Sequence, residues 1–324
     1  MREYGFELRL CATLERRRRG VIARQLGGAV LDPGTRVVDV VHVAPGPAFE
    51  DRTGLTPEPI PRPVIDADLG VARWRPVTKA IPGEPERARA AAERGAELGV
   101  LERARRDGRS VVRRAAPYPK DWFGAVTAIE NKPDLATPGD LGRQLRTDVA
   151  LGLFDRVVLA TASHVTGAHL NRIPEPVGVW EFDPEERSVA VIREPTALEP
   201  GAAGVEIRAE HPGRTDIATV DAAAKARARR QIAERAYGKG WRPDRYPACA
   251  NAVATDAGVP ECRYYDRVVD PATDCGRSCP AREAASPPSV DVAELRAART
   301  DWEPEPEPVA RRQADLTGFR SDPE

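Results

Sequence analysis

Two short apolar segments that lie far apart in the sequence constrain the fold more than any other feature. Residues 36–43 (RVVDVVHV) and 122–132 (WFGAVTAIENK) are rich in β-branched and apolar residues, which predicts two mostly buried strands. Between them, residues 44–83 contain eight prolines, too many for regular structure. We therefore expect a sheet whose strands are separated by an inserted segment, irregular up to residue 83 and helical over residues 84–106.

The other periodic segments predict alternating helices and strands. Residues 3–18 have apolar residues at helical spacing, and Thr137-Pro138 supplies an N-cap followed by proline for a second helix. Further segments predict a short helix and three strands, at residues 165–172 for the helix and 156–162, 177–182 and 188–193 for the strands. This order predicts an α/β domain with a mixed central sheet flanked by helices.

The chain divides into four parts on composition. Residues 1–43 and 118–215 form the predicted α/β core, and residues 44–117 form the insertion. Residues 216–283 contain a basic helix at 222–237, followed by four cysteines, and predict a small Cys-rich subdomain. From residue 284 to 324 the sequence becomes rich in proline and acidic residues, which favours a low-complexity, loosely attached tail.

Composition narrows the classes of function. The 324 residues include 49 Lys and Arg against 50 Asp and Glu, which argues against a broadly basic nucleic-acid coat and leaves a local basic patch as the alternative. No apolar run reaches the roughly 18 residues of a membrane span, and the N-terminus lacks the apolar stretch of a secretory signal. We expect a cytoplasmic protein with no membrane contact. The sequence has no P-loop or dinucleotide fingerprint, which excludes an ATP-driven motor.

Charged residues at the ends of the two apolar strands suggest a catalytic site. Asp39 is the one acid inside the first strand, and Glu130 and Lys132 are two residues apart, on the same face of the second. Gln144 follows on the predicted helix, and Glu7 lies on the first helix. Because carboxylates are hard ligands for divalent cations and an ammonium stabilises hydroxide, these residue types point to metal-assisted hydrolysis.

This constellation resembles the PD-(D/E)XK nuclease superfamily, and its RecB- and Cas4-like members in particular. The resemblance implies a restriction-endonuclease-like fold that hydrolyses DNA phosphodiester bonds, with RNA not excluded. It makes Asp39 and Glu130 ligands of Mg²⁺ (or Mn²⁺) and Lys132 the residue that orients or helps deprotonate the attacking water. Glu7 corresponds to the additional helical acid, and Gln144 to the glutamine of RecB-like members.

The sequence departs from that pattern in two ways. Asp148 stands where RecB-like members usually have a tyrosine, and Asp121, nine residues before Glu130, competes with Asp39 as the first acid. A nuclease-fold protein that binds nucleic acid or a protein partner without cleaving is the alternative function. Residues 3–193 also resemble a family of unknown function from halophilic archaea, through the runs IENKPDL, QLRTDV and GAHLNRIPE.

Four of the five cysteines form a second candidate site. Cys249, Cys262, Cys275 and Cys279 follow the pattern C-x12-C-x12-C-x3-C. Because disulfides are disfavoured in the cytosol, the cluster predicts a metal site, either Zn²⁺ or a [4Fe-4S] cluster; unligated or disulfide-forming cysteines remain the alternative. Cys11, on the apolar face of the first helix, is expected to be a buried structural residue.

The basic helix offers a nucleic-acid contact. The expected role of these residues is either to grip a phosphate backbone beside an aromatic platform or to form a solvated charged face; they are Lys225, Arg227, Arg229 and Arg230, followed by Lys239, Trp241 and Arg242.

Overall fold

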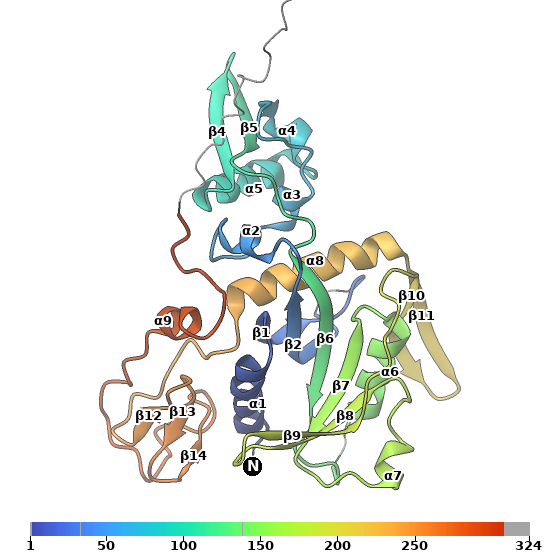
Figure 1. Cartoon of the computed structure of the whole chain (residues 1–324), viewed down its shortest axis with the longest axis vertical. Helices are drawn as coiled ribbons and strands as arrows, with labels where there is room; N and C mark the ends of the chain where they lie inside the picture. The colour runs from blue at the N-terminus through green and yellow to red at the C-terminus, as the bar shows by residue number, and fades with distance from the viewer. Residues whose placement is uncertain (1, 33, 138, 308–324) are drawn as a thin grey trace, which may run out of the picture.

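A mixed six-stranded sheet forms the centre of the protein (Figure 1). The computed structural model describes residues 2–32, 34–137 and 139–307. In sheet order the strands are β1 (Val21–Gly27), β2 (Val37–Pro45), β6 (Phe123–Asn131), β7 (Arg156–Thr161), β8 (Gly178–Asp183) and β9 (Ser188–Arg193). Strands β6, β7 and β8 are parallel, and the other neighbours are antiparallel. The predicted α/β class with a mixed sheet is confirmed.

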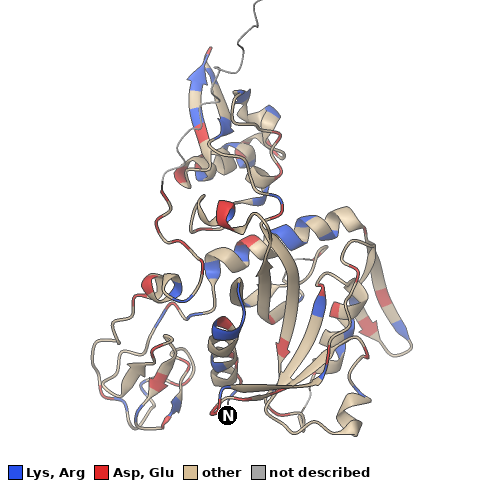
Figure 2. Cartoon of the chain, in the orientation of Figure 1, with Lys and Arg blue, Asp and Glu red and all other residues tan. Residues whose placement is uncertain are grey.

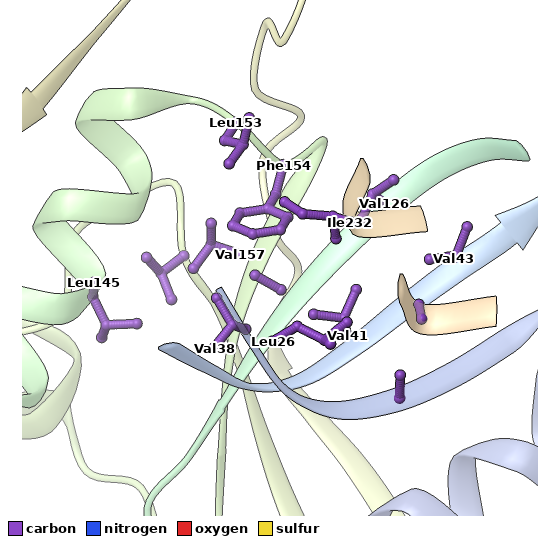
Figure 3. Packing of buried hydrophobic residues seen from close by; sticks show 14 of the residues in the cluster. Leu26, Val38, Val41, Val43, Val126, Leu145, Leu153, Phe154, Val157 and Ile232 are labelled. Atoms are coloured by element: carbon purple, nitrogen blue, oxygen red, sulfur yellow. The ribbon is translucent and has the colours of Figure 1, made fainter. Parts of the chain in front are cut away.

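Helices cover both faces of this sheet. On one face, α1 (Glu3–Arg17) packs Phe6 and Leu10 with Ile129 of β6. On the other, α6 (Leu141–Leu151) and α8 (Ala222–Lys239) contribute Leu145 and Ile232 to a large apolar cluster that also includes Val126 of β6 (Figure 3). Successive strand residues point to opposite faces, so each central strand is apolar on both sides.

The insertion between β2 and β6 is a lobe with its own apolar core. It contains α2 (Phe49–Thr53), α3 (Arg62–Ile65), α4 (Val77–Ala80), α5 (Pro85–Glu97), β3 (Arg75–Pro76), β4 (Leu101–Arg106) and β5 (Arg109–Arg114). Two expectations were wrong here. Residues 44–83 include short helices, and the helix predicted over residues 84–106 ends at Glu97. Gly99, with φ of +72°, turns the chain into β4, which pairs with β5.

A buried ion pair fastens this lobe to the core. Arg52 of α2 is fully buried, and its Nε and Nη2 atoms donate to the two carboxylate oxygens of Glu234 on α8, at 2.9 and 2.7 Å. The guanidinium also donates to the carbonyl oxygens of Thr56 and Glu58, at 2.8 Å each, and lies 4.1 Å from the ring centroid of Tyr237. Each guanidinium nitrogen and both Glu234 carboxylate oxygens therefore have a hydrogen-bond partner within the protein.

The remaining elements extend around the core. They are α7 (Gly167–Leu170), the hairpin β10 (Gly204–His211) and β11 (Arg214–Val220), the small sheet β12 (Ala252–Ala254), β13 (Pro260–Cys262) and β14 (Arg267–Val268), and α9 (Val292–Ala297). The sequence patterns do not predict β1, β10, β11, the three strands of the small sheet or α9. The helix expected from Thr137 begins at Leu141, and Pro138 lies outside the described residues. No helix in the described part of the chain is long and apolar enough to cross a membrane.

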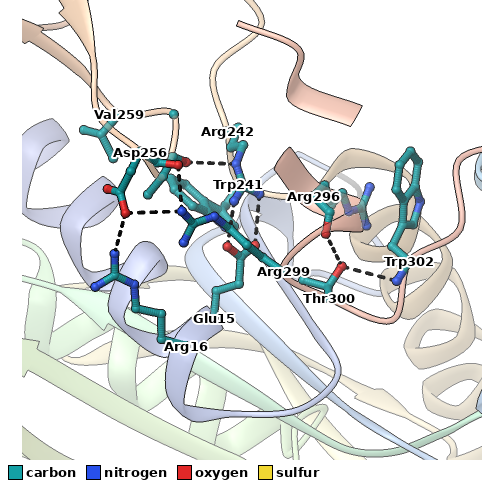
Figure 4. Close-up of polar contacts among 12 residues, drawn as sticks. Glu15, Arg16, Trp241, Arg242, Asp256, Val259, Arg296, Arg299, Thr300 and Trp302 are labelled. Atoms are coloured by element: carbon teal, nitrogen blue, oxygen red, sulfur yellow. Dashed lines mark hydrogen bonds and ion pairs between the residues drawn. The ribbon is translucent and has the colours of Figure 1, made fainter. Parts of the chain in front are cut away.

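Part of the predicted loose tail is packed against the core (Figure 4). Arg299 donates to the Asp256 carboxylate at 3.3 Å, and the Trp302 indole donates to the Pro57 carbonyl at 3.1 Å. Arg296 of α9 is buried beside Tyr237. The expectation of a loose tail therefore fails for the segment around α9, and residues 308–324 lie outside the described residues.

We expect Arg52→Ala to lower the free energy of unfolding by about 3–5 kcal/mol, because it leaves the Glu234 carboxylate buried without its counter-charge. Urea unfolding would measure this loss. The matched control is Arg62→Ala, whose side chain is half exposed and pairs with Asp66, and we expect a change within about 0.5 kcal/mol. Similar losses in both variants would contradict a fastening role for Arg52.

Candidate functional site

Four carboxyl groups from different elements meet at one end of the sheet, and we refer to them as the acidic cluster: Glu7 of α1, Asp39 of β2, Glu130 of β6 and Asp148 of α6. Antiparallel pairing brings the start of β2 beside the end of β6, with Val40 opposite Ile129. The carboxyl end of a strand that leads into a parallel crossover is a common location for ligand sites.

Asp39 lies where the regular pleat of the sheet is interrupted. Val38 and Val41 pack into the same apolar cluster although they are three residues apart, so the alternation of β2 shifts between them. Asp39 accepts a hydrogen bond from the backbone N–H of Asn131 at 2.9 Å. On the neighbouring strand, Gln25 has a φ of +54°, a conformation rare for a residue with a side chain.

Glu7 is held by three donors from the sheet. The side chains of Arg24, Gln25 and Asn131 donate to its carboxylate at 2.7, 2.8 and 3.0 Å. Gln25 also donates to Asp39, at 3.4 Å, and so links the two acids. Burial raises the pKa of Glu7, and the Arg24 guanidinium opposes that shift. The other side-chain atom of Asn131, Oδ1, is buried and has no hydrogen-bond partner within the described residues.

Arg36 joins the other two acids on the opposite face of the sheet. Its Nε and Nη2 atoms donate to Asp148 at 3.0 and 2.6 Å, and Nη2 also pairs with Glu130. All three side chains are buried. Burial and the nearby Asp39 charge raise the pKa of Glu130 to about 8, although Arg36 partly offsets them, because one guanidinium serves several carboxyl groups.

The other predicted residues lie around the acidic cluster or away from it. Lys132 directly follows β6 and is half-buried. Its backbone N–H donates to the Ala160 carbonyl of β7 at 2.9 Å and so extends the hydrogen bonding between β6 and β7 by one residue. Gln144 is one turn before Asp148 on α6, on the same helix face. Asp121 precedes the opposite end of β6, roughly 30 Å along the strand from Glu130. The structure therefore brings Asp39, and not Asp121, to the acidic cluster.

Sequence reasoning missed Arg36 as a member of the site. Arg36 is the first residue of the predicted strand over residues 36–43 and directly precedes β2 in the structure, and Asp148 stands where RecB-like members usually have a tyrosine. The sequence did contain a sign of this pair. A charged residue lies at the end of a buried strand, and an acid lies on the apolar face of the predicted helix, and both positions are unusual unless the two charges are paired.

The four clustered cysteines line a single cavity of about 240 Å³. None of them forms a disulfide. Backbone N–H groups of Glu283 and Asn251 donate to the Cys249 sulfur and lower the pKa of that thiol, whereas burial and the charges of the other three cysteines raise the pKa of Cys275. Cys11 is fully buried on α1, as predicted.

A preformed coordination sphere is absent from both candidate sites. In residues 2–32, 34–137 and 139–307, no group of three or more His, Cys, Asp or Glu side chains is arranged so that it could hold a metal ion. At the acidic cluster the carboxylate oxygens face Arg24, Gln25 and Arg36 instead.

The residues that follow the basic helix are buried, whereas Arg227, Arg229 and Arg230 on the helix itself are partly exposed. Trp241 is buried and donates to Glu15 at 2.8 Å, and Arg242 pairs with the same carboxylate at 2.7 Å (Figure 4). Arg229 pairs with Asp155 at 2.7 Å. The expectation of an exposed aromatic platform after α8 is therefore wrong, because these side chains hold α1 and the sheet.

We expect stability to fall as pH rises between 4.5 and about 8, because folded Glu130 keeps a proton that the unfolded chain has lost. Glutamine does not ionise, so in Glu130→Gln the free energy of unfolding should fall less steeply with pH, by up to about 1.4 kcal/mol per pH unit. Urea unfolding across this range measures both slopes. The exposed Glu50→Gln is the control and should keep the wild-type slope, and a wild-type slope in Glu130→Gln would contradict the assignment.

Comparison with known proteins gives one family and no characterised relative. The profile of a family of unknown function (DUF5787) matches residues 21–284, which include the sheet, the inserted lobe and the four clustered cysteines. No curated protein and no solved structure matches the chain. The match spans most of the sequence, and the chain therefore belongs to the family of unknown function DUF5787.

Proposed function

We propose that this protein is a divalent-metal-dependent nuclease that hydrolyses phosphodiester bonds in DNA. The observation that carries the proposal is the proximity of Asp39 and Glu130 on two neighbouring strands, with Glu7 linked to Asp39 through Gln25 and with Lys132 two residues after Glu130. These are the residues that resemble the PD-(D/E)XK motif. In that superfamily the two acids come from adjacent strands, and β2 and β6 are adjacent although a lobe of more than seventy residues separates them in sequence.

The chemistry of the acidic cluster suits Mg²⁺ or Mn²⁺. Its donors are carboxylate oxygens and the partnerless amide oxygen of Asn131, and hard oxygen ligands of this kind are what these ions prefer. Within the described residues Asp39 has no ion pair, since its oxygens accept only from the Gln25 amide and the Asn131 N–H. We infer that Asp39 and Glu130 would hold the ion after the Arg36 side chain releases Glu130, and that Glu7 would position Asp39 through the Gln25 amide that donates to both acids.

The side chains around the acidic cluster have distinct roles in this proposal. When bound, the ion would lower the pKa of a water molecule and offset charge on the phosphodiester. Lys132 shares a strand face with Glu130, so its ammonium can reach the same side of the sheet, where it would hold the attacking water and stabilise developing negative charge. Gln144, one turn before Asp148, would orient the substrate or Lys132.

A basic hairpin in the inserted lobe supports a polyanionic substrate. The ribbon of strands β4 and β5 is coloured blue at its Lys and Arg positions in Figure 2, and the exposed cations of this hairpin are Arg103, Arg105, Arg106 and Arg109. Arg106 and Arg113 both lie over the Trp74 ring, at 4.9 and 4.6 Å from the centroid. Arginines beside an aromatic ring are typical of surfaces that hold a nucleic-acid backbone.

One observation favours the second candidate, a nuclease-fold protein that binds nucleic acid or a partner without cleaving it. Arg36 pairs with both Glu130 and Asp148, and a guanidinium in that position supplies the positive charge that a catalytic ion would otherwise supply. If this pairing persists in solution with Mg²⁺ present, the ion cannot bind Glu130 and metal-dependent hydrolysis cannot occur. The protein would then only bind nucleic acid or a partner.

The test is cleavage of labelled single- and double-stranded DNA by purified wild type with Mg²⁺ or Mn²⁺. We expect chelation to abolish cleavage, Glu130→Gln to remove it, and Lys132→Ala to reduce it by at least about 100-fold, since proton-transfer groups contribute that much. Lys79→Ala is the matched control, because Lys79 is an exposed lysine in the lobe.

Each alternative result has a definite meaning. Equal cleavage by wild type and Glu130→Gln would indicate a contaminant and overturn the proposal. Binding of DNA by an inert wild type, measured by fluorescence anisotropy, would establish the second candidate. A labelled RNA strand in the same assay decides which nucleic acid is the substrate.

A further inference from the structure

We propose that Cys249, Cys262, Cys275 and Cys279 form a Zn²⁺ site that holds together the segment around β12, β13 and β14. All four residues line one cavity, and none is joined to another by a disulfide. Four thiolates are a complete ligand set for a structural zinc ion. This site is separate from the acidic cluster, and the proposal stands whether or not the protein is a nuclease.

Backbone contacts gather the four cysteines independently of their sulfur atoms. Ala252 pairs with Cys262 across β12 and β13, which places the turn carrying Cys249 beside the end of β13. The N–H of Ala250 donates to the Glu283 carbonyl at 2.8 Å, and the Asn251 amide donates to the Ala281 carbonyl at 2.9 Å. The segment that follows Cys279 is thereby held against the segment that carries Cys249.

The surroundings of Cys249 resemble those of a metal-bound thiolate. Backbone N–H groups of Asn251 and Glu283 donate to its sulfur, and hydrogen bonds of this kind stabilise the negative charge that a thiolate retains when it binds a metal. Arg245 and Arg282 line the same cavity, and their charges would offset part of the excess negative charge of four thiolates around one divalent ion, whereas Arg267 is paired with Asp274 there.

The segment has too little apolar core to explain its order otherwise. Its three strands are two or three residues long, and the hydrophobic side chains buried within residues 244–290 are Ala257, Val259, Val268 and Val269. Three of these four pack towards α1, away from the cavity. Small units with so few buried apolar groups need a disulfide or a metal ion for stability, and disulfides are absent here.

In this proposal metal binding completes the local fold. The four cysteines share the cavity without forming one coordination sphere, so a bound ion would have to draw their sulfur atoms together. All four side chains are partly exposed, which suits zinc, an ion without redox chemistry, better than an oxidation-sensitive iron–sulfur cluster.

The test is the metal content of the full chain, purified under reducing and anaerobic conditions and analysed by mass spectrometry for zinc and iron. We expect about one zinc per chain in the wild type and less than about a tenth of that in Cys262→Ala and Cys275→Ala. Cys11→Ala is the matched control: its cysteine is buried on α1, and the variant should keep its zinc. Reconstitution with Co²⁺ should give cobalt–thiolate absorption in the wild type and in Cys11→Ala only.

A measurement on the wild type alone covers the case in which the cysteine variants do not fold. Removing zinc with a chelator should make four thiols reactive that were protected before, while circular dichroism shows that the core remains folded. Four thiols that react at once in untreated protein, iron with sulfide in place of zinc, or a disulfide detected by mass would each overturn the zinc assignment. Glu130→Gln should retain its zinc whatever its effect on DNA cleavage, so the two proposals fail separately.

Discussion

The pairing of β2 with β6 is the contact on which the rest of the structure depends. It joins two strands separated by the whole inserted lobe, and it alone brings Asp39 beside the end of β6, where Glu130 lies. Bringing the two strands together across so long a connection costs conformational entropy, but this cost increases only slowly with the length of the connection. The lobe offsets part of the cost because it buries an apolar core of its own. The fully buried Arg52–Glu234 pair then fixes where the lobe leaves and re-enters the sheet.

The acidic cluster concentrates more negative charge than its arginines neutralise. Arg24 pairs with Glu7, and Arg36 is shared between Glu130 and Asp148, which leaves Asp39 without an ionic partner within the described residues. A protein gains no stability from burying several carboxyl groups around so few cations. Buried carboxyl groups with too few cations and a residue with left-handed backbone, here Gln25, are both features that are common at functional sites.

Local patterns in the sequence predicted the central strands, α1, α8 and the α/β class, because buried strands and amphipathic helices leave strong periodicity. The local patterns missed β1, because the polar side chains of Arg24 and Gln25 are typical of an exposed segment. In the folded protein both side chains donate to Glu7. These patterns also placed Trp241 and Arg242 on a surface, although both are buried against Glu15, because a charged residue gives no local sign that its partner lies more than two hundred residues away. The site residues that share a strand were predictable, and Arg36 and Asp148, which meet only through tertiary packing, were not.

Burial and charge together explain why a cation belongs at the acidic cluster in the proposed function. A carboxyl group with the raised pKa of Glu130 is largely protonated at neutral pH and is then a poor metal ligand. A divalent ion must therefore displace that proton as well as the Arg36 guanidinium, and its affinity should rise with pH through the same range in which Glu130 ionises. Arg36 thus has two physical effects: it stabilises the ionised acids when the ion is absent, and it competes with the ion for the same oxygens.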